Sequence, residues 1–313
     1  MRYRRRSNMD QVTCYAPGST SNVGPGFDCL GIAIAGMGDR VSAARCHAPG
    51  VRVLSVSDPR IPCDPARNTA ALAAAEVLRQ ARSAGVGLEL RVEKGLPLSG
   101  GLGGSAASAV AGAFAANALL GRPLDAEALL HCALEAEAVV AGRHPDNAAP
   151  SLLGGAVVVL GTQPLRYARL TVHPSLRLVF ATPAYGVETA RARAVLPASV
   201  PRADAVGQAS ALAGLVLGLE RGDGALLRVA MVDRVAEPYR IPLYPGYARA
   251  REAALAAGAF GVAVSGAGPT LLAIVPEGGE AAVGRAVVAA YEEDGTSTRL
   301  HVAGVDSEGA RLE

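Results

Sequence analysis

The sequence contains no tryptophan, and only four phenylalanines and eight tyrosines stand among its 313 residues. Aromatic side chains therefore cannot dominate its core, although half of the residues are hydrophobic. We expect a core made of alanine, valine and leucine. A chain of this length can bury a sizeable core and typically divides into two domains.

Other absences disfavour whole classes of protein. The net charge of +2 is too small to indicate a nucleic-acid or membrane-surface partner. No apolar run is long enough to span a bilayer. The basic start MRYRRRSN is not followed by the apolar region of a signal peptide, and translation could begin at Met1 or at Met9. Five cysteines without metal-ligand spacing indicate reduced thiols in a cytoplasmic protein.

Lysine is almost absent as well, because 29 of the 30 basic residues are arginines. The single lysine, Lys94, precedes a glycine-rich segment over 97–107 (PLSGGLGGSAA) that leads into an alanine-rich helix. Glycines let main-chain amides approach a ligand, and a helix start adds a positive dipole end, so this segment predicts a phosphate site. It is not a Walker loop, which needs its own lysine. A plain turn before a core helix is the alternative.

A polar loop is expected near the N-terminus. A short strand over 12–15 runs into a segment rich in proline, glycine, serine and asparagine, and an apolar segment follows from Cys29. Asn22 and Asp28 are polar groups among the glycines of this loop. An ordinary hairpin connection would have a similar composition.

Periodicity and capping residues predict further elements. We expect a helix over 68–80 capped by Asn68 and a second helix that begins after Asp125. Glu137 lies near the end of the second helix, where a surface charge is the default reading. Strands are expected within 39–56, 86–92, 176–182, 260–275 and 298–305, and a last helix over 280–291.

The segment over 142–159 (GRHPDNAAPSLLGGAVVV) groups His144, Asp146 and Asn147 within four positions. This grouping is consistent with a turn rich in Asp and Asn, and equally with a functional site.

Five motifs, in order along residues 12–306, resemble those of the GHMP kinase superfamily. The segment over 97–107 is similar to its second motif, P-x-x-x-G-L-G-S-S-A-A, with Gly104 in place of the first serine. The segment over 16–31 (APGSTSNVGPGFDCLG) is similar to the first motif and SGAGPT, over 265–270, to the third. H-x-D-N-x-A-P-x-x-L-G-G from His144, and the segments around Arg193 and Arg240, resemble the homoserine kinases within the superfamily.

The resemblance implies an α+β, two-domain GHMP kinase fold. Its N-terminal domain would be of the ribosomal protein S5 domain 2-like kind and its C-terminal domain ferredoxin-like. Residues 1–11 would be an overhanging or disordered N-terminus, 12–165 the ATP-binding domain, and 166–313 the C-terminal domain.

The resemblance also implies an activity: transfer of the γ-phosphate of ATP to the hydroxyl of L-homoserine, in threonine biosynthesis. Substrates would be L-homoserine and ATP with Mg²⁺, no nucleic acid or membrane would be a partner, and a homodimer is left open. Two alternatives remain, namely another GHMP kinase acting on mevalonate or a sugar, and a non-catalytic ATP-binding sensor.

Site residues follow from the same resemblance. The acceptor would meet Asn22 and Asp28 at its amino group and Arg193 and Arg240 at its carboxylate, with Thr189, His144 and Asp146 beside it. Ser105 and Glu137 would hold Mg²⁺, which prefers oxygen ligands, and Asn68 would lie near the adenine. The nucleotide would contact Pro97, Leu98, Ser99, Gly100, Gly101, Leu102, Gly103, Gly104, Ser105, Ala106 and Ala107.

Asn147 and His144 are the candidate catalytic residues. Related mevalonate and galactose kinases have an aspartate where this chain has Asn147. An amide cannot act as a base, so Asn147 can only orient the acceptor hydroxyl. His144 could take the proton near neutral pH, but we rank this second to direct attack with the proton passing to the phosphate.

Overall fold

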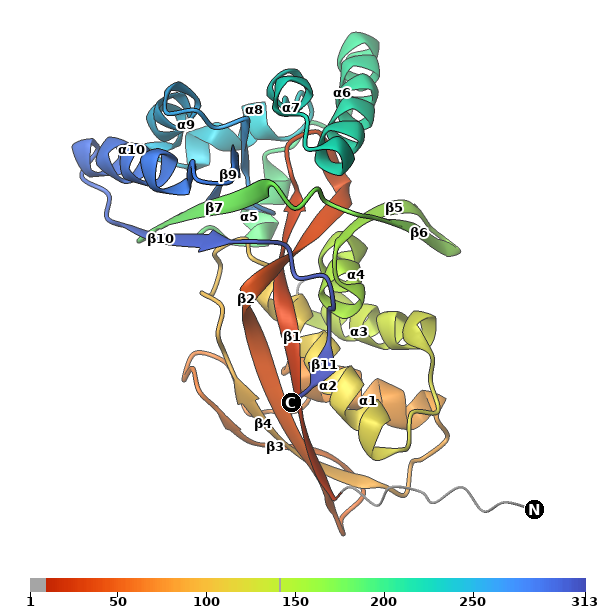
Figure 1. Cartoon of the computed structure of the whole chain (residues 1–313). Helices are drawn as coiled ribbons and strands as arrows, with labels where there is room; N and C mark the ends of the chain where they lie inside the picture. The colour runs from red at the N-terminus through yellow and green to blue at the C-terminus, as the bar shows by residue number, and fades with distance from the viewer. Residues whose placement is uncertain (1–9, 141) are drawn as a thin grey trace.

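The computed structural model describes residues 10–140 and 142–313. Most of the expected N-terminal overhang, residues 1–9, lies outside this range. Two sheets organise the described chain (Figure 1). The larger has seven strands in the order β11-β1-β2-β4-β3, with β5 paired to β2 and β6 to β5, and the smaller has the order β10-β7-β9-β8. The predicted α+β fold is confirmed.

The larger sheet and its helices come mostly from the first half of the chain. Its strands are β1 (Gln11–Asn22), β2 (Gly26–Cys46), β3 (Gly50–Val56), β4 (Gly87–Glu93), β5 (Ala156–Thr162), β6 (Leu165–Leu170) and β11 (Arg311–Leu312). Its helices are α1 (Thr69–Gln80), α2 (Gly104–Leu119), α3 (Ala126–Val140) and α4 (Pro145–Leu153).

The smaller sheet belongs to the second half. Its strands are β7 (Leu176–Pro183), β8 (Gly261–Val264), β9 (Leu271–Pro276) and β10 (Thr298–Ala303). The helices of this half are α5 (Thr189–Ala194), α6 (Arg202–Arg221), α7 (Gly224–Ala230), α8 (Glu237–Arg240), the 3-10 turn η1 (Ile241–Leu243), α9 (Tyr247–Ala256) and α10 (Glu280–Glu293).

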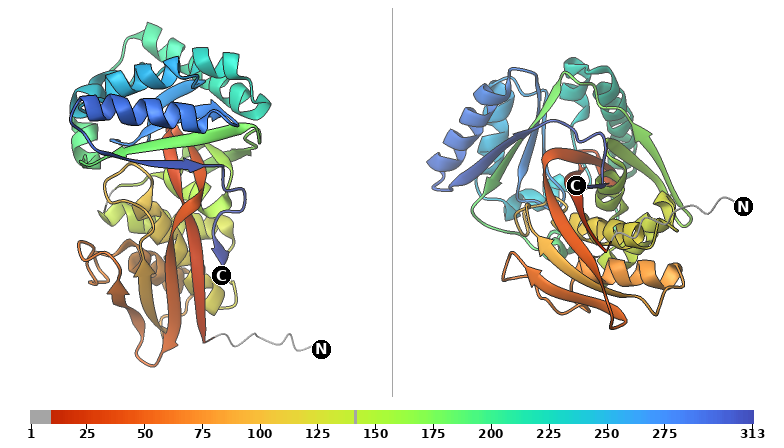
Figure 2. Two further views of the ribbon diagram at one scale, coloured as in Figure 1. Left: turned by 60° about the vertical axis from the view of Figure 1, so that its left-hand side comes forward. Right: turned by 60° about the horizontal axis from the view of Figure 1, so that its bottom comes forward.

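Helices α1 to α4 gather on one side of the long strands β1 and β2, and α9 and α10 cover the smaller sheet (Figures 1 and 2). The main core cluster is made of alanine, valine and leucine with two cysteines, as the composition predicts. Gly112 lets α1 and α2 pack closely, because a Cβ at this position of α2 would overlap the carbonyl of Ala70 in α1. Within the described residues, no helix is both long and apolar enough to cross a bilayer.

Strand β1 is longer than the sequence suggests. We expected a strand to end at Tyr15 and a loop to follow, but β1 continues to Asn22. Ser19, Thr20 and Ser21 pair with residues of β2, which satisfies the backbone groups that a loop would leave to solvent. The polar residues of this segment therefore belong to a buried strand.

Two other expectations need correction. The segment that starts at Pro145 forms the helix α4, with a proline in its first turn, where the missing N–H costs nothing. The expected domain boundary after residue 165 is too early, because β6 pairs with β5 in the larger sheet and the chain leaves that sheet after Leu170. The chain also returns to the larger sheet at its end, where β11 pairs with β1.

Candidate active site

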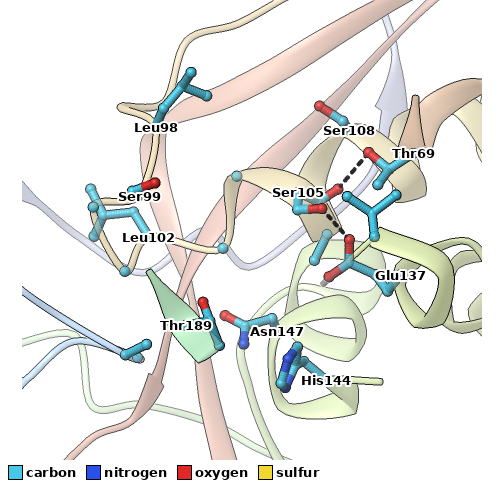
Figure 3. A pocket seen from close by; sticks show the side chains of 18 of the residues that line it. Thr69, Leu98, Ser99, Leu102, Ser105, Ser108, Glu137, His144, Asn147 and Thr189 are labelled. Atoms are coloured by element: carbon cyan, nitrogen blue, oxygen red, sulfur yellow. Dashed lines mark hydrogen bonds between the residues drawn. The ribbon is translucent and has the colours of Figure 1, made fainter. Parts of the chain in front are cut away.

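A cavity of about 380 Å³ lies where the two halves of the chain meet. The predicted site residues that line it are Asn22, Asp28, Asn68, all of 97–106, Glu137, His144, Asp146, Asn147, Thr189, Arg193 and Arg240. Figure 3 shows Ser105, Glu137, His144, Asn147 and Thr189 around it. The structure thus brings together residues from seven separate segments of the sequence.

Ala107 is the one predicted site residue that does not line the cavity. Its side chain is fully buried in a hydrophobic cluster, and its N–H already donates to the carbonyl of Gly103 at 2.9 Å. Neither group is therefore available to a nucleotide.

The glycine-rich segment forms a tight loop that ends at α2. Gly101 (φ 74°) and Gly103 (φ 64°) adopt left-handed conformations that favour glycine. A Cβ at Gly101 would overlap the carbonyl of Ser265, and one at Gly103 would overlap the Ser19 hydroxyl. At Gly104, the first residue of α2, a Cβ would meet only ordinary neighbours at 3.5 Å or more. The first N–H groups of a helix have no acceptor within it, and such a helix start favours the binding of an anion.

Ser105 and Glu137 lie side by side, as Figure 3 shows. The Ser105 hydroxyl donates to Oε1 of Glu137, and Thr69 Oγ1 donates to the Ser105 carbonyl at 3.2 Å. Burial raises the pKa of Glu137 to about 7, although the Ser105 hydrogen bond and the Lys94 charge lower it. A hydroxyl and a carboxylate are the oxygen ligands that Mg²⁺ prefers, and two protein ligands suffice when phosphates complete the shell. The two residues present therefore fit this ion.

The Asn147 amide is held at both ends. Its Oδ1 accepts from Ser19 Oγ at 3.1 Å, and its Nδ2 donates to Ser21 Oγ at 3.0 Å.

The neighbouring Asp146 is 2% exposed. Burial, with a smaller contribution from the Asp28 charge, raises the pKa of Asp146 to about 7, while a hydrogen bond with Ser21 lowers it.

Asp28, Arg193 and His144 all line the cavity, and Arg193 contacts the other two. Arg193 donates twice to the Asp28 carboxylate, at 2.8 and 3.1 Å, and this hydrogen bonding raises the pKa of Arg193. Arg193 Nη2 also lies 3.2 Å from Nδ1 of His144. A guanidinium can only donate, so Nδ1 accepts and the proton of a neutral imidazole sits on Nε2. His144 therefore contacts Arg193 through Nδ1, and its role as a base stays a prediction.

Arg240 is a buried cation. It is 3% exposed, and it donates to the carbonyls of Ala192 at 3.0 Å and Gly266 at 3.2 Å. Desolvation is the main cause that lowers its pKa. None of the ion pairs between described residues includes it. The guanidinium lies 5.1 Å from the ring centre of Phe27, a weak compensation compared with a carboxylate.

The amides of Asn22 and Asn68 already have protein partners. Asn22 donates to the carbonyl of Gly266 at 2.7 Å and accepts from the Asp28 N–H at 2.9 Å, so it ties the N-terminal strands to the loop over 265–270. Asn68 caps α1, as predicted, by accepting from Ala70 and Ala71 N–H groups, and it donates to Pro62.

The sequence interpretation did not identify several residues that shape this site. Lys94 lines the cavity and pairs with the buried Asp39, and Ser19 and Ser21 hold Asn147. The signal for Lys94 was its place as the only lysine, directly before the loop. The signal for the serines was their spacing of two, which puts them on one face of a strand.

The chain matches models of two families of domains, described as the GHMP kinases N terminal domain, over residues 68–155, and the GHMP kinases C terminal domain, over 215–293. It is 39% identical over 305 residues to the homoserine kinase of Prochlorococcus marinus (strain MIT 9313), covering 96% of this chain and 95% of that protein. It is also 39% identical to the homoserine kinase of Xanthomonas campestris pv. campestris (strain B100), over 96% and 94% of the two chains.

A solved structure agrees with these relatives. The crystal structure of homoserine kinase from Cytophaga hutchinsonii superposes with a TM-score of 0.95 at 34% identity, over the full length of both chains. Similarity of this extent covers both halves of the fold and every segment that lines the cavity. The chain belongs to the homoserine kinase family of the GHMP kinases.

Proposed function

We propose that this protein transfers the γ-phosphate of ATP to the hydroxyl of L-homoserine, at the cavity between its two sheets. The observation that carries this proposal is the buried guanidinium of Arg240, which lines the cavity without a carboxylate partner among the described residues. A buried cation is stabilised by an anion of fitting geometry, and a carboxylate matches the fork of a guanidinium. An acceptor with a carboxylate, such as an amino acid, satisfies this demand.

The Asp28–Arg193 pair supports an amino-acid acceptor. Both side chains are partly exposed, with relative accessibilities of 43% and 40%. A zwitterion that enters between them replaces one ion pair with two, with its ammonium at Asp28 and its carboxylate at Arg193 and Arg240. The buried Asp146 offers a second carboxylate to the ammonium, whose charge would favour the ionised form of that group. Thr189, the first residue of α5, also lines the cavity.

Asn147 would orient the acceptor hydroxyl. Ser19 and Ser21 fix its amide, so its polar atoms hold a defined direction in the cavity. Positioning of this kind is a large part of catalysis in phosphoryl transfer, where little covalent work falls to the protein. The hydroxyl oxygen forms a bond to the γ-phosphorus, the bond to the bridging β–γ oxygen breaks, ADP leaves, and the hydroxyl proton passes to the transferred phosphate.

The loop over 97–106 and the start of α2 would bind the triphosphate through main-chain amides and the helix dipole. Ser105 and Glu137 would hold Mg²⁺ against it. When bound, this ion neutralises charge on the phosphates. Asn68, whose amide already bonds to Pro62 and Ala70, would lie near the adenine.

The experiment that tests this function measures ADP release with three acceptors, L-homoserine, mevalonate and galactose, at saturating ATP and Mg²⁺. We expect turnover with L-homoserine alone. Turnover with mevalonate or galactose instead would assign the protein to another GHMP reaction. ATP binding without turnover on any of the three would favour the sensor alternative.

A further inference from the structure

The only lysine of the chain is buried beneath the phosphate loop (97–106). The Lys94 side chain is 5% exposed, and its ion-pair partner Asp39, on β2, is fully buried. Besides Asp39, the ammonium donates to the Gly104 carbonyl at 2.7 Å and to Ser108 Oγ at 2.8 Å. An ammonium has three N–H donors, and with these three acceptors each donor has a partner within the protein.

The Lys94–Asp39 pair joins the two ends of the loop. Asp39 Oδ1 accepts from the N–H of Gly95, which lies just before the loop, at 3.1 Å. Lys94 donates to the carbonyl of Gly104, where the loop ends and α2 begins. Ser108, one turn further along α2, donates to Asp39 Oδ2 at 2.6 Å and closes the cluster. Three side chains therefore hold residues 95 and 104 in one place.

The surroundings leave this cluster little freedom. A Cβ at Gly95 would overlap the carbonyl of Gly38, so the backbone before the loop lies directly against β2. On the other side, Gly104 is followed at once by Ser105, whose hydroxyl donates to Glu137. A shift of the Gly104 carbonyl would therefore move the amides of the first turn of α2 and the Ser105 hydroxyl together.

We propose that Lys94 is a positioning residue, which acts through Asp39 and the Gly104 carbonyl to preset the phosphate loop for a triphosphate, and does not itself contact the nucleotide. A buried ion pair is a weak source of stability because desolvation offsets its attraction. Its benefit here is a single loop conformation, which lowers the ordering cost of binding phosphates through main-chain amides. This inference rests on the proposed function, because it takes the loop over 97–106 as the part of the site that binds ATP.

The first test compares two ligands that share the base and sugar. ATP and adenosine are titrated into the parent and into Lys94→Met by calorimetry. We expect ATP affinity to fall about tenfold, equivalent to about 1.4 kcal/mol, with adenosine affinity unchanged. Because Lys94→Met leaves Asp39 buried and unpaired and the variant could fail to fold, the double variant Lys94→Met/Asp39→Asn, without either charge, is measured alongside it and should show the same selective loss.

Arg311→Met is the matched control. Arg311 pairs with Asp306, a carboxylate that is 6% exposed, and neither residue lines the cavity. This variant should lose stability while its ratio of ATP to adenosine affinity stays at the parent value. A folded Lys94 variant with parental ATP affinity, or an equal loss for both ligands, would overturn the proposal. These binding data stand even if the parent does not phosphorylate homoserine, so failure of one proposal is distinguishable from failure of the other.

The second test uses the fact that the chain has one lysine. Isotope-labelled lysine gives a single side-chain resonance in the parent. We expect its ammonium protons to exchange slowly with water and its shift to change little when ADP or ATP is added. A large shift with ATP but not with adenosine would show that Lys94 contacts the phosphates directly, against the proposed positioning role.

Discussion

Replacing Arg240 by methionine removes the cation that the proposed acceptor needs while retaining most of the volume of the side chain. In the parent, the guanidinium is buried and lies near the Phe27 ring, with no carboxylate in ion-pair contact among the described residues. Loss of one partner from a buried, hydrogen-bonded charge pair costs about 2–5 kcal/mol. Because Arg193 still faces the acceptor carboxylate, we expect the lower end, a rise of about 30-fold in KM for homoserine.

The substitution also has a structural cost. The carbonyls of Ala192 and Gly266 lose a donor, and Gly266 retains the bond from Asn22 whereas Ala192 loses its side-chain partner. An unpaired buried acceptor costs about 1–3 kcal/mol, so each variant is first shown to be folded by its thermal unfolding. Arg228→Met is the matched control, because Arg228 also donates to a buried backbone carbonyl, that of Ala259 at 3.0 Å, but does not line the cavity.

The assay has two arms. Coupled ADP release gives KM for homoserine, and calorimetry gives the affinity for an ATP analogue. Arg240→Met should change the first and leave the second within about threefold of the parent, and Arg240→Lys should recover part of the loss because a point charge cannot form the fork. If Arg240→Met instead lost the ATP analogue and kept its KM for homoserine, the arginine would belong to the nucleotide and the case for an amino-acid acceptor would fail.

Glu137→Gln should abolish most turnover and weaken its dependence on Mg²⁺, because it removes the charge of a metal ligand. The variant should remain folded, since the side-chain volume is retained. Normal turnover across a magnesium titration would exclude Glu137 from the metal site. Asp146 has a pKa raised from its ordinary 3.8 to about 7, so its neutral form is preferred in the folded chain and its contribution to stability is lost as pH rises between these values. The parent should therefore lose thermal stability across that window more steeply than Asp146→Asn, and equal slopes would contradict the burial argument. Gly104→Ser should keep activity within about threefold of the parent, because a Cβ there meets neighbours at 3.5 Å or more. Gly103→Ala should lose most of its activity, because a Cβ would overlap the Ser19 hydroxyl and the residue has a left-handed φ of 64°. Equal activities of the two variants would refute the loop geometry.

Features that depend on a few neighbouring residues were predicted correctly from the sequence. Asn68 caps α1 through the N–H groups of Ala70 and Ala71, and Asp125 accepts from the N–H of Ala128 at the start of α3. The glycine-rich loop ends at a helix for the same reason, since backbone freedom and helix propensity are local properties. Resemblance to known kinases, rather than periodicity, named the residues that line the cavity.

Errors arose where distant partners decide the conformation. The polar segment before Asn22 forms a strand because β2 supplies its hydrogen-bond partners. The segment from Pro145 forms a helix that packs against β1, β2 and α2, and no local pattern distinguished it from a turn. The boundary after residue 165 failed for the same reason, because β6 belongs to the larger sheet only through its pairing with β5.

The chemical groups of the chain, and the motifs in which they stand, can be read from the sequence. Their pairing and protonation depend on the tertiary structure. Asp28 and Arg193 are 165 positions apart and form an ion pair, which holds Arg193 against His144. Burial raises the pKa of Glu137 and Asp146 to about 7. Arg240 is also buried, and no carboxylate among the described residues forms an ion pair with it. These states follow from desolvation and from charges brought close by folding, and neither is a property of adjacent residues.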